Sequence, residues 1–185
     1  MLDWATLQVH RLLAAGAVLL FACDELERLG SFASAFVVEE KRVTHICTSA
    51  SARIQQEYHD RFGREEIVFA LTRETFDDAW TRLESGTALI QPDLVPRALT
   101  LLPAEARTVA EWMYWRSGEG ALALLPLRAE GALVGLLTVL GGRLRESDLP
   151  AVLKFGEHVS VAWANARQFE KLTYLANRGK LCPTE

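Results

Sequence analysis

The residues from Leu12 to Cys23 read LLAAGAVLLFAC, and all are apolar or small before Asp24 and Glu25 close the run. A helix that spans a bilayer needs about 20 apolar residues, so this run is too short to cross a membrane. A helix that is apolar all round must be covered on more than one side. We therefore expect a helix from about Asp3 to Leu29 that covers a core and also meets a second helix, from this chain or another.

A secretion signal is the alternative interpretation of the same run, because LFAC resembles a lipoprotein cleavage site at Cys23 and Arg11 precedes the apolar stretch. Asp3 and the lack of a positively charged cluster before the run argue against a signal. Cleavage before Cys23 would also remove nearly all of the first helix. We therefore expect Cys23 to be a buried thiol, the chain not to insert into a membrane, and its location to be cytoplasmic.

Composition indicates one globular domain that does not bind nucleic acid. The chain has 185 residues, of which 50% are hydrophobic and 24% charged, enough to bury a core without disulfides or metals. Its net charge of -4 and its scattered basic residues do not suit a protein that holds a phosphate backbone.

The cysteines predict neither disulfide scaffolding nor a metal site. Cys23, Cys47 and Cys182 are odd in number, far apart in sequence and without a CxxC pair, which is typical of a reducing compartment. His45 lies two residues before Cys47, but the other three histidines share no short spacing with a cysteine, and a zinc site would normally need a second such pair of ligands two to five residues apart. No metal is therefore expected.

Hydrophobic periodicity and turn signals predict alternating strands and helices of an α+β fold with an antiparallel sheet. The expected strands are Phe32 to Glu39, Val43 to Ser49, Glu66 to Leu71, Ala88 to Ile90, Ala121 to Leu127 and Ala132 to Leu140. The expected later helices are Ala52 to Arg61, Thr75 to Leu83, Ala104 to Arg116 and Asp148 to Arg178. Prolines 92, 96 and 103 exclude a continuous helix between Gln91 and Pro103.

The last helix carries an apolar repeat at steps of three and four, which is typical of the seam between two helices. We expect this seam to form a homodimer interface, made by Val152, Phe155, Val159, Ala162, Ala166 and Phe169. Leu153 and Trp163 lie off the seam and are expected to face the domain's own sheet.

The stretch from Ser117 to Leu172 resembles the closing half of a GAF domain. A strand ends in Pro126 and Leu127, the next strand is built around Gly135, Leu136 and Leu137, and the last helix carries Asn165, Ala166 and Arg167. The first half is similar more weakly, at DELERLGSFASAFVVEE and SGTALIQPDL. These motifs are structural, so they indicate the fold more firmly than a function.

The resemblance implies a regulatory input domain of the PAS-related GAF type. It implies a six-stranded antiparallel sheet with helices on one face, a small-molecule pocket on the other, and long terminal helices that dimerise. Residues 1–178 would form this single domain, and 179–185 a tail or the start of a missing output domain. The tail LTYLANR, from Leu172 to Arg178, is similar to the LTGLxNR opening of diguanylate cyclase domains, with Tyr174 in place of glycine. A chance match is the alternative for so short a motif.

In the family's topology, the loop and helix after Gln91 form the roof of the pocket. We expect the ligand to be held there by Asp93, Arg97, Trp112, Tyr114 and Trp115, with Cys47 and Phe69 on the sheet side. The alternative is that one of the tryptophans is ordinary core, that Asp93 shapes a turn and that Cys47 is inert. The ligand itself stays unidentified.

Specialised chemistry of the family is not expected here. No cysteine lies between Cys47 and Cys182 to attach a bilin, and three isolated cysteines do not supply methionine sulfoxide reduction. GxSxG and HExxH motifs are absent. Three hypotheses remain: a dimeric sensor that signals to an output partner, a GAF-like scaffold with a filled pocket, and a small enzyme that uses Cys47 or His45.

Overall fold

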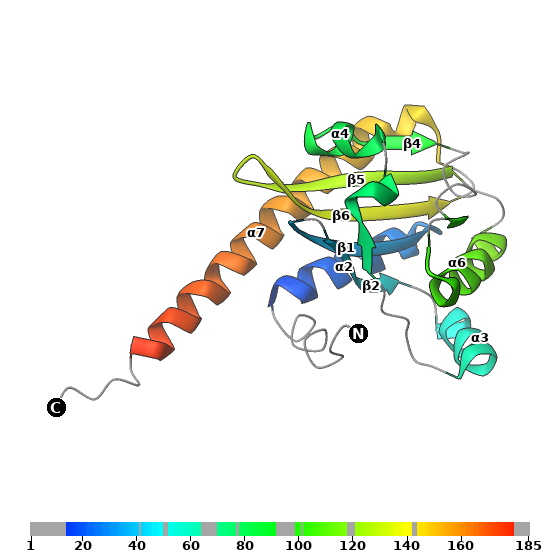
Figure 1. Cartoon of the computed structure of the whole chain (residues 1–185), viewed down its shortest axis with the longest axis horizontal. Coiled ribbons are helices and arrows are strands. Elements are labelled where there is room, and N and C mark those ends of the chain that lie inside the picture. Colours follow the sequence, from blue (N-terminus) through cyan, green and yellow to red (C-terminus); the bar gives the residue numbers. More distant parts are fainter. Residues whose placement is uncertain are drawn as a thin grey trace.

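A six-stranded antiparallel sheet in the order β3-β2-β1-β6-β5-β4 organises the chain (Figure 1). The computed structural model describes residues 14–40, 42–49, 52–63, 70–76, 78–91, 99–100, 102–117, 121–141 and 144–179. Its elements are α2 (Ala14–Arg28), β1 (Phe32–Glu39), β2 (Arg42–Ser49), α3 (Ala52–Phe62), β3 (Ala70–Thr72), η1 (Arg73–Phe76), α4 (Asp78–Glu84), β4 (Leu89–Gln91), α6 (Ala104–Ser117), β5 (Ala121–Ala129), β6 (Ala132–Gly141), η2 (Glu146–Asp148) and α7 (Leu149–Gly179). The expected α+β class and antiparallel six-stranded sheet are confirmed.

Two local predictions differ from the observed elements. The helix expected over Thr75 to Leu83 is divided into the 3-10 turn η1 and the short helix α4. The strand expected over Glu66 to Leu71 is described as β3, Ala70–Thr72, because residues 64–69 lie outside the described part. The hairpin expected around Glu130 and Gly131 is confirmed, and both residues adopt positive φ there.

Helices pack on both faces of the sheet (Figure 1). α2 and α7 lie side by side on one face, where Leu19, Cys23 and Trp163 join small and branched strand residues in one apolar cluster. α4 and α6 cover the other face, where Trp80, Leu83 and others form a second cluster. The helical layer was expected on one face only. Of the second layer, α6 is the helix expected to roof the pocket, whereas α4 had no expected place there.

A β-bulge between β1 and β2 sets which side chains of β2 reach each layer. Ala35 pairs with Cys47 and Phe36 pairs with His45, so Ile46 is the extra residue. As a result, Ile46 and Cys47 both join the cluster under α2 and α7. His45 lies beside Phe36, with ring centroids 5.3 Å apart, on the opposite face.

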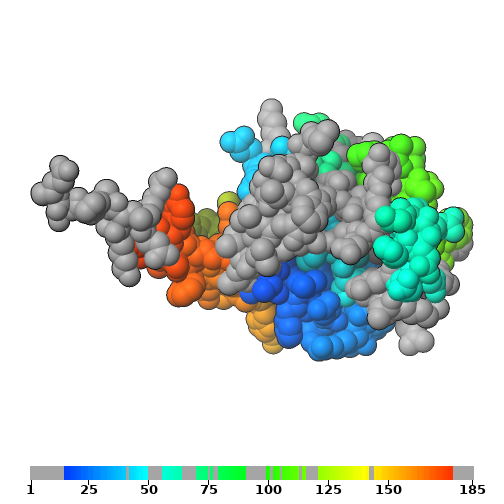
Figure 2. Space-filling view, turned by 90° about the horizontal axis from the view of Figure 1, so that it is seen from below, coloured from blue at the N-terminus to red at the C-terminus, as the bar shows by residue number. Residues whose placement is uncertain are grey.

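α2 buries the inner side of the apolar run and leaves its outer side open. Cys23 is 0% exposed, which confirms the expected buried thiol, whereas Phe21 is 63% exposed. Among the described residues, none of the helices combines the length and apolarity that a membrane span requires. Space filling shows α2 on the molecular surface, beside the projecting end of α7 (Figure 2).

Candidate ligand-facing site

A chain of polar side chains crosses the three central strands on the α4 and α6 face. The hydroxyls of Ser34 on β1 and Thr48 on β2 are hydrogen bonded at 2.7 Å, and Thr48 is also 2.7 Å from Nε2 of His45. Thr138 on β6 donates its hydroxyl to the backbone oxygen of Ser34 at 3.3 Å. His45 is only 2% exposed, so the contact with Thr48 gives its Nε2 a hydrogen-bond partner within a largely apolar layer.

The network can also exchange partners with a bound molecule. A serine or threonine hydroxyl has one donor and two acceptor positions, and it rotates to suit its neighbours. Ser34, Thr48 and Thr138 are half-buried, so they are less enclosed than His45. We name Ser34, His45, Thr48 and Thr138 the polar network.

Aromatic side chains from α3 and α6 gather at the end of the sheet where the polar network lies. Tyr58 and Phe62 of α3 lie 6.1 and 5.9 Å from the ring of Trp112 on α6, between ring centroids. β2 ends at Ser49 just before α3, and α6 ends shortly before β5, so both helices adjoin this end (Figure 1). Aromatic rings beside a few hydrogen-bonding groups are typical of small-molecule sites.

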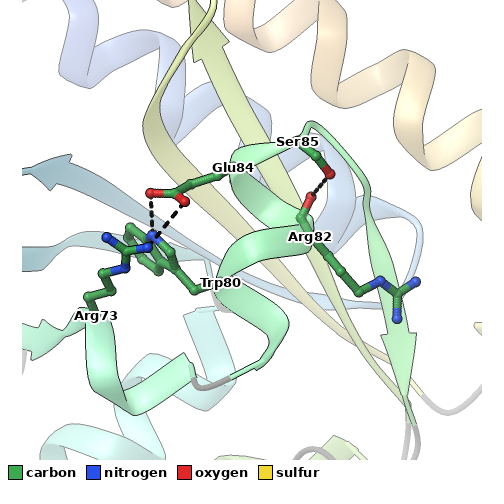
Figure 3. Close-up of polar contacts among 5 residues, drawn as sticks. All are labelled: Arg73, Trp80, Arg82, Glu84 and Ser85. Atoms are coloured by element: carbon green, nitrogen blue, oxygen red, sulfur yellow. Dashed lines mark hydrogen bonds and ion pairs between the residues drawn. The ribbon is translucent and has the colours of Figure 1, made fainter.

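The other half of the same face is closed by packed side chains. Trp80 of α4 is 3% exposed and lies in the cluster with Phe36, Leu124 and Leu136 of the sheet. Its indole N–H donates to Glu84 at 2.6 Å (Figure 3). Arg73 donates to the same carboxylate at 3.3 Å, so η1 and α4 are held together over the sheet. The packed side chains of this half stabilise the fold.

Comparison with known proteins gives the fold a name. No family model and no curated protein matches the sequence. A solved structure of the PixJ GAF domain from Thermosynechococcus elongatus, in its blue-light-absorbing form, is 11% identical, with a TM-score of 0.58 over 96% of this chain and 98% of that chain. The protein has a GAF fold.

Other GAF structures agree with this assignment. A GAF domain/HD domain protein from Geobacter sulfurreducens is 10% identical, with a TM-score of 0.57 over 86% of this chain and 98% of that chain. The GAF-B domain of DevS from Mycobacterium smegmatis is 15% identical, with a TM-score of 0.52 over 85% of this chain and 98% of that chain. The expected resemblance is thereby confirmed at the level of the fold.

The expected ligand residues do not all lie together in the structure. Trp112 belongs to the aromatic group described above, whereas Trp115 is 66% exposed and contacts Tyr114 at 5.6 Å between ring centroids. The predictions for Asp93, Arg97 and Phe69 fall outside the described residues. Of the two tryptophans, Trp112 therefore packs with the aromatic rings of α3, whereas the ring contact given for Trp115 is with Tyr114.

Cys47 requires a correction. It was expected on the ligand side of the sheet, but the bulge at Ile46 turns it into the layer under α2 and α7. Its Sγ lies 4.0 Å from that of Cys23. His45 and Cys47 consequently face opposite sides of the sheet, and they do not form the pair that a thiol enzyme would need.

α7 uses much of its expected seam for the domain's own core. Val159 is 7% exposed, while Val152, Phe155 and Ala166 pack against the same cluster. Ala162 and Phe169 are exposed. Trp163 is 2% exposed and Leu153 packs partly against the cluster, which confirms that both face the domain.

A set of apolar residues that shares only Phe169 with the expected seam is left on the outside of α7. Val161, Phe169, Leu172 and Leu175 are 54% to 67% exposed. At 100° per residue, Val161, Leu172 and Leu175 lie roughly opposite Trp163 and Val159, and Phe169 lies at the edge of this exposed face. We name these four residues the outer stripe. Of these four residues the sequence analysis named only Phe169, because a heptad pattern does not say which helix face meets the sheet.

The polar network was also missed by sequence analysis. Its members lie in ordinary strands, separated by up to 104 residues between Ser34 and Thr138. The available signal was the alternation of β1, where Ser34 points away from the face to which Ala33 and Ala35 point. In the described ranges, no three His, Cys, Asp or Glu side chains are grouped so that they could hold a metal ion.

Proposed function

We propose that this chain is a non-catalytic GAF-type sensory or regulatory domain that binds a small molecule and signals as a homodimer to an output partner. The observation that carries the proposal is the separation of two roles by the sheet. One face bears the polar network, with the aromatic rings of Tyr58, Phe62 and Trp112 beyond its end, and the other bears α2 and the long helix α7. A ligand on the first face would act on α7 by favouring one arrangement of the sheet and its helices.

The chemistry of the polar network favours a small polar ligand. Hydroxyls and an imidazole both donate and accept hydrogen bonds, and they carry no fixed charge that would select an ion. The rings of Tyr58, Phe62 and Trp112 supply apolar contact nearby. The expected site residues Asp93, Arg97, Tyr114 and Trp115 remain part of the proposal as polar and aromatic contributors from the roof.

A Thr48→Val variant tests the ligand proposal. Valine keeps the shape of threonine but removes the hydroxyl that joins Ser34 to His45. Native mass spectrometry of protein purified from its host should show a copurified small molecule on the wild type and at least a severalfold lower occupancy on the variant. Thr44→Val is the matched control, because Thr44 lies on the same strand next to Val43 and points to the other face.

An unchanged bound mass in Thr48→Val would contradict the assignment of the ligand to the polar network. The absence of any bound molecule would favour the second candidate, a GAF scaffold used for dimerisation or protein contact. One observation supports that candidate: Trp80, Leu83 and their neighbours already fill half of the same face.

We propose that α7 carries the signal from the domain to its output partner. Residues 1–178 form the proposed sensory domain, with 179–185 as its tail, and the diguanylate-cyclase-like stretch from Leu172 lies at the end of this helix. A similar solved structure is part of a methyl-accepting chemotaxis protein, residues 122 to 287, at 13% identity, with a TM-score of 0.56 over 89% of this chain and 96% of that chain. The resemblance of the stretch from Leu172 to Arg178 makes a diguanylate cyclase one candidate output domain.

A further inference from the structure

Two cysteines that are distant in the sequence meet in the core between α2 and the sheet. Cys23 on α2 and Cys47 on β2 are 24 residues apart, and their Sγ atoms are 4.0 Å apart. Cys23 is 0% exposed and Cys47 is 3% exposed. The bulge at Ile46 is what turns Cys47 toward the helix, so the meeting depends on a specific feature of the strand pair.

The surroundings of Cys23 keep its thiol uncharged. Ala22, Leu26 and Ala35 are buried in the same apolar cluster. The hydrogen bond with the Cys47 thiol, followed by burial, raises the pKa of Cys23 far above its ordinary value. A thiolate nucleophile or a metal bound by two thiolates would place negative charge in this layer, whereas a disulfide is neutral.

We propose that Cys23 and Cys47 are a reversible oxidation site, at which a disulfide joins α2 to β2. With hydrogen peroxide as the oxidant, one thiol loses its proton to water when α2 opens locally, and the resulting thiolate attacks the peroxide to give a sulfenic acid. The hydroxide released takes up a proton and leaves as one water. The second thiol then displaces the hydroxyl group, forms the sulfur–sulfur bond and releases a second water. Two thiols thus lose two electrons and two protons, and the peroxide is reduced to two molecules of water.

Closure of the bond has a mechanical consequence. The sulfur atoms must approach to about 2 Å, so side chains rotate or α2 moves toward β2. α2 also packs along α7, and the backbone N–H of Ala15 donates to Glu170 of α7 at 2.8 Å. A movement of α2 would therefore displace α7, which packs along it. Any effect on an output partner rests on the proposed function, but the formation of the disulfide does not.

Access controls the rate of the reaction. Both sulfurs are covered by α2, so a small uncharged oxidant reaches them when this helix opens locally. The oxidation site should therefore respond to sustained exposure to peroxide, on the timescale of that opening, in contrast to exposed low-pKa thiols that react at once.

The experiment uses the full chain with Cys182→Ala, which removes the third cysteine as a partner. After incubation with hydrogen peroxide, intact mass should fall by two hydrogens, and peptide mapping without reductant should recover Cys23 linked to Cys47. Dithiothreitol should reverse the change. The unfolding temperature of the oxidised protein should be higher by about 10 °C, because the crosslink restricts the unfolded chain.

The matched variant is Cys47→Ala, which should show neither the mass loss nor the rise in unfolding temperature. If this variant does not fold, peptide mapping of the Cys182→Ala protein still decides the question. Thiols that stay reduced, or that advance to sulfinic acid without a crosslink, would overturn the proposal, and so would a crosslink that forms only in denatured protein.

Discussion

Gly135 shows how one residue can fix the distance between two strands. It pairs with Val37 of β1, and a Cβ at this position would lie 2.8 Å from the backbone oxygen of Phe36. Gly135→Ala should therefore force the central strands apart and lower the free energy of unfolding by about 1–3 kcal/mol in urea titrations. Gly156→Ala in α7 is the matched control, because its Cβ would meet Leu125 at an ordinary 3.7 Å. Equal stability of Gly135→Ala and the wild type would contradict this account.

Cys23 predicts a stability change at alkaline pH. Its pKa is raised in the folded protein by the hydrogen bond to Cys47 and by burial, whereas an unfolded thiol titrates near pH ~8.5. Above that pH the unfolded state has lost a proton that the folded state keeps, so the folded state becomes less favourable as pH rises. Stability from this group should be constant below about pH 8 and should fall by about 1.4 kcal/mol per pH unit above the unfolded pKa.

Urea titrations of reduced protein between pH 7 and 10 measure this effect, and Cys23→Ala corrects for lysines and tyrosines that titrate in the same range. The variant should lose stability less steeply than the wild type. Parallel pH profiles would show that the Cys23 thiol contributes nothing to the alkaline change.

At the scale of single elements, α7 has two faces. One packs into the core, and the other carries the outer stripe. Phe169→Glu combined with Leu172→Glu places two charges on exposed stripe positions, so it should convert a dimer to a monomer without loss of the fold. Sedimentation velocity at tens of micromolar and the unfolding temperature measure the two effects. Val159→Glu would not separate them, because Val159 is 7% exposed and part of the core.

Tyr174→Glu is the control for the stripe. Tyr174 is 57% exposed but lies two residues from Leu172, on the far side of the helix. This variant should remain a dimer. A double variant that stays dimeric, or a wild type that is already monomeric, would remove the outer stripe as the interface.

The elements also show which features a sequence can reveal. Alternation and turn residues predicted both long hairpins, because a half-buried strand must point every second side chain to the core. The same rule fails at Ile46, where one extra residue changes the face of Cys47. A bulge leaves no clear sequence signal, so the Cys23–Cys47 contact and the true side of Cys47 could be found only in three dimensions. Within the polar network, likewise, Ser34 and Thr138 meet only because β1 and β6 pair.

At the scale of the whole molecule, α7 begins as a structural layer and ends outside the domain. Trp163 lies in the core and Glu170 accepts the N–H of Ala15, whereas every side chain in residues 171–176 is exposed. Figures 1 and 2 show this last part of α7 projecting from the body of the protein. The fold and the projecting helix should therefore be separable.

A chain that ends at Glu170 tests this separation. It keeps the core residues of α7, so its unfolding temperature should stay within about 2 °C of the full chain, since surface changes cost roughly 0.5 kcal/mol or less. It loses Leu172 and Leu175 of the outer stripe, so self-association in sedimentation should weaken at least tenfold. A chain that ends at Ala162 also loses Trp163 and should be destabilised by about 3–5 kcal/mol or more. Collapse of the fold in the longer truncation would mean that the projecting end of α7 stabilises the domain as well as any dimer.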